Sequence, residues 1–319
     1  MEALRSLIAA VMLAPLAALA QSYPAKAVRI VLPFGPGGVA DITARTLAPK
    51  MSESLGQQVV IENMPSAGGI RASETVAKAE PDGYTLLLLT NGNAVSKALF
   101  KSLPYDPMSD FAMISTVAYF SMVVVTRGDG PYKTLKDVIA AAKATPGKVN
   151  IGSINPGGTQ HLAAELLRTS AGMDAVVVPH KTTGEVTIGT VNGNLDISVD
   201  FIAPLISSIR AGTLRPLAVT AGKRFPGLPE VPTVIEAGVP GYDVASWNAL
   251  AAPAKTPRAS LEKVREALQL ALGDPAVQKR FGELGVDGRA STSEELRNFY
   301  QSEAKRWTQV VERAGIPKQ

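Results

Sequence analysis

The same short turn sequence occurs twice in this chain, 120 positions apart, each time between a strand pattern and a helix pattern. Residues 28–33 form a strand pattern before Pro36-Gly37-Gly38, and residues 149–155 form another before Pro156-Gly157-Gly158. A helix start leaves backbone N–H groups unpaired and carries a partial positive charge, and glycine lets a ligand oxygen approach those groups closely. The two turns together predict a cleft that binds an anion from both sides.

The length and composition favour two globular domains and a small anionic ligand. The chain has 319 residues, of which 46% are apolar, so it is long enough for roughly two domains of ~150 residues with a large core. Aromatic residues make up only 5%, and the longest basic clusters are pairs such as Lys223-Arg224, so we expect no nucleic-acid partner. The formal net charge of +4 fits an anionic ligand, and solubility explains it equally well.

The first twenty residues are typical of a cleavable signal peptide. Arg5 precedes an apolar run over residues 7–16, and Ala18-Leu19-Ala20 resembles a cleavage site, so we expect cleavage before Gln21. The run is shorter than the ~20 residues of a spanning helix, so a retained anchor is the less favoured alternative. The chain has no cysteine, which excludes lipid attachment through a cysteine, disulfides and thiolate metal sites. We therefore expect a periplasmic protein without a lipid anchor.

Strand and helix patterns alternate from Ala27 onward with short connections, which predicts parallel strands covered by helices. The run from Phe111 to Thr126 is long for one strand, since ~5–6 residues are usual, and we interpret it as a segment that leaves one domain and enters another. A strand pattern over residues 246–252 then returns. These patterns predict an α/β fold with two lobes, each a mostly parallel sheet flanked by helices, and a ligand cleft between the lobes at the strand C-termini. The expected boundaries are 1–20 for the signal peptide, 21–122 with 244–319 for domain I, and 123–243 for domain II.

Neither turn matches a nucleotide-binding motif. Walker A requires Lys followed by Ser or Thr, and the dinucleotide fingerprint requires a third glycine where Ala40 stands. No Gly-x-Ser-x-Gly elbow is present, so Ser153, beside Gly152, is the one serine that we consider as a nucleophile. Two histidines without cysteine or a His-x-x-x-His pair predict no metal site. We expect no enzyme activity and no cofactor, with a periplasmic hydrolase using Ser153 as the alternative.

Several polar residues have both a structural and a ligand-binding interpretation. Asp41 falls in the first turn of a helix, where the dipole stabilises any aspartate, and it equally could shape the ligand loop. His161 is also in a first turn, but its helix-period partners are apolar, so packing is favoured over ligand contact. His180, like Asp200 with Phe201, ends a strand on the side where ligands bind, and the two interpretations are weighted equally.

A series of motifs runs along the chain in a fixed order. The motifs are Pro33-Phe34 with Pro36-Gly37-Gly38, Asp41-x-x-Ala44-Arg45, Glu62-Asn63-x-Pro65-x-Ala67-Gly68-Gly69, Pro81-Asp82-Gly83-Tyr84-Thr85, Tyr105-Asp106-Pro107 with Asp110-Phe111, Pro146-Gly147-Lys148, His161-Leu162-Ala163, Val178-Pro179 with Lys181, Leu217-Ala218-Val219-Thr220, Val231-Pro232-Thr233-x-x-Glu236-Ala237-Gly238, Ser246-Trp247 and Ala252-Pro253-Ala254. Each motif alone is weak. As a set, covering nearly the whole chain after the predicted signal peptide, they resemble the Bug-type (TctC-like) receptors, the extracytoplasmic solute-binding proteins of tripartite tricarboxylate transporters.

The resemblance implies a periplasmic-binding-protein fold (type II-like) whose two domains close on a ligand and deliver it to a membrane permease. It also implies that the loops over residues 34–41 and 153–161 hold one carboxylate, largely through backbone amides and ordered water. The far end of the ligand then meets variable residues. His180, Thr182 and Ser66 replace a usual tyrosine, glycine and glycine, so the identity of the ligand is not carried over from any relative.

We therefore expect a monomeric periplasmic receptor for a small organic acid, a dicarboxylate or an aromatic carboxylate, that serves the permease subunits of a tripartite transporter. A sensor that presents the ligand to a membrane kinase is a further alternative, because it needs the same closing cleft. The first domain is expected to hold one carboxylate in place. The second domain is expected to contact the same carboxylate and the rest of the ligand. The expected contacts are Phe34, Gly37, Gly38, Val39, Ala40, Asp41 and Asn91 in the first domain, and Ser153, Gly158, Thr159, Gln160, His161, His180, Thr183, Asp200 and Phe201 in the second.

Overall fold

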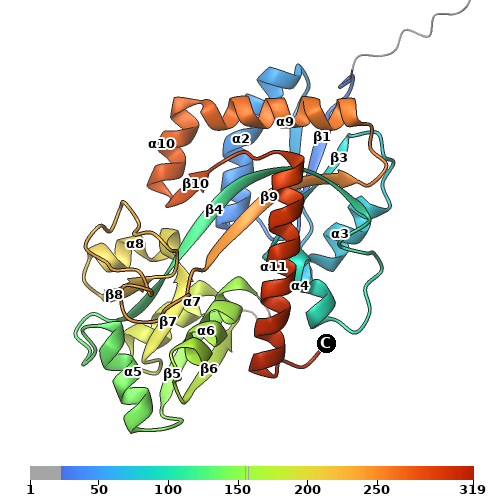
Figure 1. The fold of residues 1–319 in the computed structure, drawn as a ribbon. Coiled ribbons are helices and arrows are strands. Elements are labelled where there is room, and N and C mark those ends of the chain that lie inside the picture. Colours follow the sequence, from blue (N-terminus) through green and yellow to red (C-terminus); the bar gives the residue numbers. More distant parts are fainter. Residues whose placement is uncertain (1–22, 155, 157) are drawn as a thin grey trace, which may run out of the picture.

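The computed structural model describes residues 23–154, 156 and 158–319 (Figure 1). The predicted signal peptide and the turn residues Asn155 and Gly157 lie outside the described residues. The strands are β1 (Val28–Leu32), β2 (Val59–Asn63), β3 (Thr85–Thr90), β4 (Phe111–Arg127), β5 (Val149–Ile154), β6 (Ala175–His180), β7 (Ile197–Phe201), β8 (Leu214–Val219), β9 (Ala245–Pro253) and β10 (Val286–Gly288). The helices are α2 (Val39–Leu55), α3 (Ile70–Ala77), α4 (Asn91–Leu99), α5 (Leu135–Ala144), α6 (Thr159–Ser170), α7 (Thr183–Val191), α8 (Ile202–Arg210), α9 (Arg258–Gly273), α10 (Pro275–Glu283) and α11 (Ser293–Ala314), with a short 3-10 helix η1 (Ala67–Gly69).

The strands form two lobes that share strand β4. In the first lobe β2, β1 and β3 are parallel, while β9 pairs antiparallel with both β3 and β4, and β10 pairs antiparallel with β4. In the second lobe β6, β5 and β7 are parallel, and β4 pairs antiparallel with β7 and β8. Each lobe thus contains the expected parallel strands, and the strands that cross between lobes add antiparallel pairs to both sheets.

Strand β4 confirms that the long run from Phe111 is the connection between the lobes. As far as Ser121 it pairs with β9, ending with Ser121 opposite Ala245. From Met122 onward it pairs with β7 and β8, beginning with Met122 opposite Phe201. One uninterrupted strand therefore carries hydrogen bonds in both sheets and changes partners between two consecutive residues.

Thr220 joins the two crossing segments at the point where β4 changes partners. Its buried hydroxyl donates to the Val244 carbonyl at 2.7 Å and accepts from the Met122 amide at 3.2 Å. Its backbone amide donates to the Met122 carbonyl at 3.0 Å, and its carbonyl accepts from the Val244 amide at 2.8 Å. Both connections between the lobes are therefore held by one residue.

Helix α11 packs against both lobes (Figure 1). Its Leu296 and Tyr300 lie in the core of the first lobe beside Trp247, and its Trp307 lies in the core of the second. The buried carboxylate of Glu303 accepts both indole N–H groups, from Trp247 at 3.1 Å and from Trp307 at 2.9 Å. The apolar side chains of this helix therefore face the cores of both lobes.

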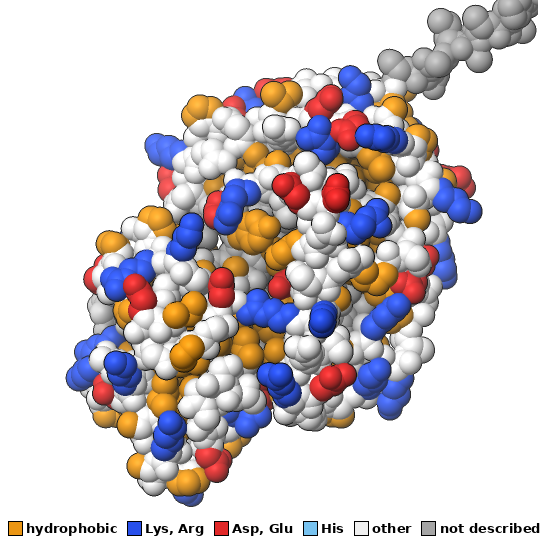
Figure 2. Space-filling view, viewed as in Figure 1, with side chains coloured by type: hydrophobic (Ala, Val, Ile, Leu, Met, Phe, Trp, Pro, Cys, Tyr) orange, Lys and Arg blue, Asp and Glu red, His pale blue; other side chains and the backbone are white. Residues whose placement is uncertain are grey.

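The visible surface carries mixed charge rather than one basic patch. Figure 2 shows Lys and Arg side chains interspersed with Asp and Glu over both lobes. Among the helices that the structure describes, none has the length and apolar character needed to cross a membrane.

Helices α4 and α7 are not predicted by the sequence patterns. Both begin with turn-like residues, and α7 is rich in glycine and β-branched residues, which are weak helix formers. Side-chain caps stabilise them instead. Thr90 and Asn93 form a reciprocal capping box on α4, and Thr182 accepts from the Glu185 amide on α7.

Replacing Thr220 with valine keeps the side-chain shape and removes the hydroxyl that joins the crossing segments. We expect the free energy of unfolding to fall by about 1–3 kcal/mol, because the Met122 amide and the Val244 carbonyl lose a buried partner. Urea denaturation measures this change. Thr145→Val is the control, since that exposed hydroxyl donates only within its own helix to Ala141, and we expect a change below about 0.5 kcal/mol. Equal effects of the two substitutions would contradict a special role for Thr220.

Candidate ligand-binding site

The two helices that follow the glycine turns begin in the same way. Gly38 precedes α2 with φ −75° and ψ 165°, and Gly158 precedes α6 with φ −71° and ψ 165°. Neither residue provides a side-chain cap, and the carbonyl of each accepts the first helical bond, from Ile42 at 3.0 Å and from Leu162 at 2.9 Å. The N–H groups of both first turns are thus left without a capping side chain, as the sequence predicts for an anion site.

The loop before α2 is open in front of its glycines. A Cβ atom built on Gly35, Gly37 or Gly38 would meet no heavy atom within 4 Å. Gly37 has φ +86°, a conformation that residues with a side chain rarely adopt. Phe34, just before the turn, keeps 42% of its surface exposed. Atoms of a ligand can therefore approach the backbone of this loop.

Asp41 shapes that loop. It is 2% exposed, and its carboxylate accepts from the Gly37 amide at 2.9 Å, from Arg45 Nε at 3.0 Å and from Asn63 Nδ2 at 2.9 Å. Asn63 also donates to the Phe34 carbonyl at 3.1 Å, so the start of the loop is held as well. Burial raises the pKa of Asp41, but the hydrogen bonds from Arg45, Gly37 and Asn63 outweigh it and leave the pKa below its usual value. The structure thus gives Asp41 the loop-shaping role, and its hydrogen bonds to protein groups occupy both oxygens.

The facing edges of the two lobes meet along β4. Ser246 lies opposite Phe120 in the first lobe, and Asp200 lies opposite Val123 in the second. Phe120 and Val123 are three residue steps apart along one strand, which is about 10 Å at the usual rise of an antiparallel strand. The C-terminal ends of the parallel strands of both lobes therefore lie on either side of a short stretch of β4.

The first turn of α6 reaches across this stretch. The hydroxyl of Thr159 lies 3.5 Å from the hydroxyl of Ser246 in the other lobe. The next residue, Gln160, donates from Nε2 to Asp200 Oδ1 at 3.2 Å. Phe201 contributes a further contact between lobes, since its ring packs edge-on against Phe120 at a centroid distance of 6.2 Å. The structure thus brings Thr159, Gln160, Asp200 and Phe201, all at strand or helix ends, together near the junction of the lobes.

Buried polar atoms without a hydrogen-bond partner lie at these strand ends. They include both amide atoms of Asn91, which follows β3, and the hydroxyl of Ser153, near the end of β5. Asp200 Oδ2 and Asn248 Oδ1 are also unpartnered, and Asn248 lies opposite Thr90 between β9 and β3. These four residues, the unpartnered cluster, are each at most 3% exposed. Buried polar groups are almost always paired in folded proteins, so such a cluster is typical of a ligand site.

Asp200 is the acidic member of the unpartnered cluster. Its Oδ1 accepts from the Phe201 amide at 2.7 Å and from Gln160, whereas Oδ2 has no partner among the described residues. Burial raises the pKa of Asp200, and the polar groups of Thr183, Phe201 and Gln160 near the carboxylate oppose that rise.

Ser246 and Asn248 lie in this region and are not among the contacts expected from the sequence. Both interrupt an otherwise apolar strand pattern at alternate positions, which was the available signal. Ser153, considered from sequence as a nucleophile, has no hydrogen-bond partner among the described residues, so no base is bonded to it there. The described residues contain no group of three or more His, Cys, Asp or Glu side chains placed to hold a metal ion.

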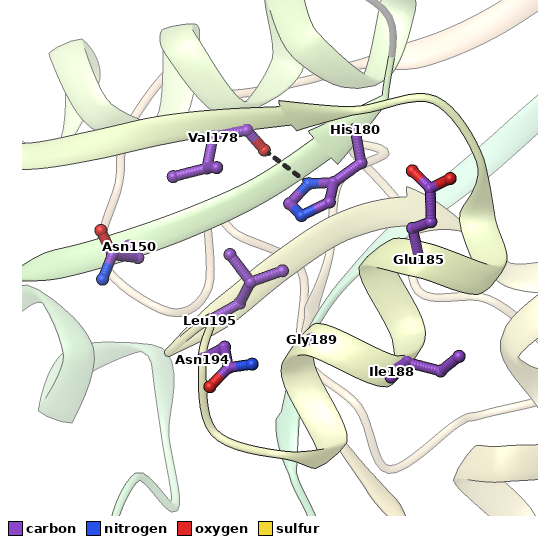
Figure 3. A pocket seen from close by; sticks show the side chains of 8 residues that line it. All are labelled: Asn150, Val178, His180, Glu185, Ile188, Gly189, Asn194 and Leu195. Atoms are coloured by element: carbon purple, nitrogen blue, oxygen red, sulfur yellow. Dashed lines mark hydrogen bonds between the residues drawn. The ribbon is translucent and has the colours of Figure 1, made fainter.

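The two histidines lie in different surroundings. His161 is 7% exposed in the first turn of α6, and burial lowers its pKa against the opposing charge of Glu165. His180 lies at the end of β6, where its Nδ1 donates to the Val178 carbonyl at 3.0 Å (Figure 3). Its ring lines a groove of about 470 Å³ between the edge of the second sheet and α7, together with Asn150, Val178, Glu185, Ile188, Gly189, Asn194 and Leu195. None of the other expected contacts lines this groove, so a role for His180 in binding stays a prediction.

Comparison with known proteins identifies the family. The sequence model of the family TctC, described as "Tripartite tricarboxylate transporter family receptor", matches residues 43–316. The protein BugT of Bordetella pertussis is 33% identical over 298 residues, which cover 93% of this chain and 91% of BugT. The chain belongs to the TctC family of periplasmic solute-binding receptors, and the Bug-type resemblance is confirmed.

Solved structures with the same fold include two ligand complexes. The structure "R. palustris Rpa4515 with adipate" aligns with a TM-score of 0.83 and 31% identity, and covers 93% of this chain and 100% of that one. MatC from Rhodopseudomonas palustris with bound malate aligns with a TM-score of 0.77 and 31% identity, and covers 91% and 100%. The predicted fold class, a two-lobed periplasmic binding protein, is confirmed.

The lowered pKa of Asp41 predicts how Asp41→Asn depends on pH. A carboxylate whose pKa is lower in the folded state stabilises the fold above its unfolded pKa, near 3.8, and loses that contribution as pH falls through the folded value. We expect the substitution to reduce the free energy of unfolding by about 1–3 kcal/mol at pH 7, and by progressively less below about pH 4. Urea denaturation at pH 3 to pH 7 measures the change in the free energy of unfolding at each pH. Asp129→Asn, at a side chain that is 82% exposed, is the control, and an Asp41 effect that did not change with pH would contradict the assigned role.

Proposed function

We propose that this chain captures a small organic acid between its lobes and delivers it to the membrane subunits of a tripartite tricarboxylate-type permease. A dicarboxylate or an aromatic carboxylate is the expected class of ligand. The proposal is supported by membership of a solute-binding receptor family and by relatives solved with adipate and with malate.

The single observation that carries the proposal is the pair of matching helix starts beside the unpartnered cluster. An uncapped helix N-terminus offers several N–H donors and a partial positive charge to a carboxylate. The first turn of α6 contacts both lobes through Thr159 and Gln160, so an anion bound there lies at the junction. The amide donors of residues 38–40 would bind the same anion from the first lobe, in a loop whose Gly37 amide is already held by Asp41.

The proposed division of the chain follows from the strand pairing. Domain I comprises residues 21–122 and 244–319, and domain II residues 123–243. The exchange of partners at Ser121 and Met122, with Thr220 holding Met122 and Val244, supports these boundaries as the hinge. Export through a cleaved signal peptide and a monomeric state complete the proposal.

A thermal-shift screen of carboxylic acids tests the function directly. A ligand that binds only the folded state raises the melting temperature by mass action, so we expect at least one small carboxylate to do so at millimolar concentration. Neutral sugars and amines serve as the negative set. A melting temperature that rises with sugars and with no carboxylate would exclude the proposed function, and release of a product under excess ligand would instead support a hydrolase.

Val39→Pro tests the amide donors without altering a side chain that binds ligand. Proline is well tolerated at the first position of a helix, and the extended conformation of Gly38 suits a residue before proline. The substitution removes one N–H donor from the α2 cradle. We expect the dissociation constant for the acid found in the screen to rise about tenfold, because a charge-assisted hydrogen bond is lost. Isothermal titration calorimetry measures this constant.

Two matched variants control this experiment. Arg258→Pro places proline at the first position of α9, at an exposed residue outside the proposed site, and should leave affinity unchanged. Thr159→Pro compared with Thr159→Val isolates the corresponding amide of α6, because both lose the hydroxyl and only the first loses the N–H. Unchanged affinity in Val39→Pro and equal affinity in the two Thr159 variants would rule out the amide cradles as the anion site.

A further inference from the structure

We infer that the captured acid carries a hydrogen-bond donor, a hydroxyl or an ammonium group, close to its carboxylate, and that Asp200 Oδ2 accepts this donor. This inference rests on the proposed function and names the class of acid. It follows from the hydrogen-bonding capacity that the described residues leave unused where the two lobes meet.

The unpartnered atoms of this cluster include more hydrogen-bond acceptors than donors. The unpartnered donors are Asn91 Nδ2 and the hydroxyl of Ser153, whereas the unpartnered oxygens that only accept are Asn91 Oδ1, Asn248 Oδ1 and, when its carboxyl is ionised, Asp200 Oδ2. A carboxylate offers only acceptors, and the helix amides already supply it with donors. A ligand made of carboxylates and hydrocarbon alone would therefore leave buried oxygens unpaired.

The orientation of these groups is fixed by the bonds that they do make. Asn248 donates from Nδ2 to the Trp247 carbonyl at 3.0 Å, and exchanging its nitrogen and oxygen would place two oxygens in contact. Asp200 Oδ1 accepts from the Phe201 amide at 2.7 Å and from Gln160 at 3.2 Å. The free atoms of Asn248 and Asp200 are thus oxygens, and each is buried.

Asp200 lies close to the position expected for the ligand carboxylate. Its partner Gln160 is the second residue of α6, the helix whose first-turn amides would bind that carboxylate. A donor that reaches Asp200 Oδ2 therefore sits only a few bonds from the carboxylate carbon. Acids with a 2-hydroxyl or 2-amino group meet this requirement.

A hydrogen bond from the ligand to Asp200 Oδ2 has a large effect on affinity, because the site is buried. No cationic side chain among the described residues is hydrogen-bonded to Asp200, so its charge is compensated only by neutral donors. A ligand ammonium would supply both a hydrogen bond and the missing positive charge, and a hydroxyl would supply the hydrogen bond alone. An acid without either group would leave Oδ2 unpaired or require it to take up a proton.

Matched acids test this inference on the unmodified protein. Succinate, malate and aspartate differ only in the group at carbon 2, which is hydrogen, hydroxyl or ammonium, and both enantiomers of the last two are used. Adipate and 2-aminoadipate extend the comparison to a longer chain. We expect calorimetry to give a dissociation constant about tenfold or more lower for a substituted acid than for its unsubstituted partner, because the unsubstituted one leaves a buried acceptor unpaired. The ammonium and hydroxyl members identify which donor is used.

Asp200→Asn assigns the preference to Asp200. The asparagine keeps an oxygen for the Phe201 amide and Gln160, and presents an N–H donor where Oδ2 was. We expect the ratio of dissociation constants between unsubstituted and substituted acids to fall to about one or below. Asp129→Asn makes the same chemical change at an exposed side chain, and it should keep the ratio of the unmodified protein.

The outcomes separate this inference from the proposed function. Tight binding of succinate or adipate, equal to or better than that of the substituted acids, overturns the inference while the function stands. A preference for substituted acids that persists in Asp200→Asn overturns the role of Asp200. If none of the carboxylic acids of the screen or of this series binds, the function and the inference fall together.

Discussion

The structure depends on one constraint, that strand β4 is hydrogen-bonded in two sheets at once. Because residues as far as Ser121 pair with β9 and those from Met122 pair with β7 and β8, the sheets cannot be arranged independently. The shared strand places the C-terminal edge of one set of parallel strands opposite that of the other. Both glycine turns follow strands at those edges, which is the arrangement that the proposed anion site between the lobes requires.

Some groups of the loop before α2 hold its backbone in place, and others remain accessible to a ligand. Asp41 uses its buried carboxylate to hold Gly37, Arg45 and Asn63, and this network fixes the loop before a ligand arrives. A preformed loop does not lose conformational entropy on binding, which favours affinity. In the proposed function, the amides that remain exposed by this arrangement would recognise any carboxylate, because backbone N–H groups carry no information about the rest of the acid.

The sequence predicted the elements whose signals are local. The long apolar run of β4, the glycine turns and the stripe of α11 each follow from periodicity or turn chemistry. Helix α7 could not be predicted in this way, because its glycines and β-branched residues oppose a helix and the Thr182 cap with tertiary packing overrides them. The role of Asn248 also depends on strand register, since only pairing places it opposite Thr90, at the same edge as Asn91. His180 was predicted as a ligand contact only because it ends a strand, and that position does not reveal the groove beside α7.

The choice among different acids must therefore depend on side chains, and not on the backbone amides of the two helix starts. The unpartnered cluster contributes two amides, a hydroxyl and a carboxyl, all buried, and none of their free atoms depends on the glycine turns. A buried group that is left unpaired disfavours the wrong ligand as strongly as a formed bond favours the right one. Under the proposed function, substituting one or two residues such as Asp200, whose bonds to Gln160 and Phe201 leave Oδ2 free, would alter the choice of acid while the carboxylate cradle stays unchanged.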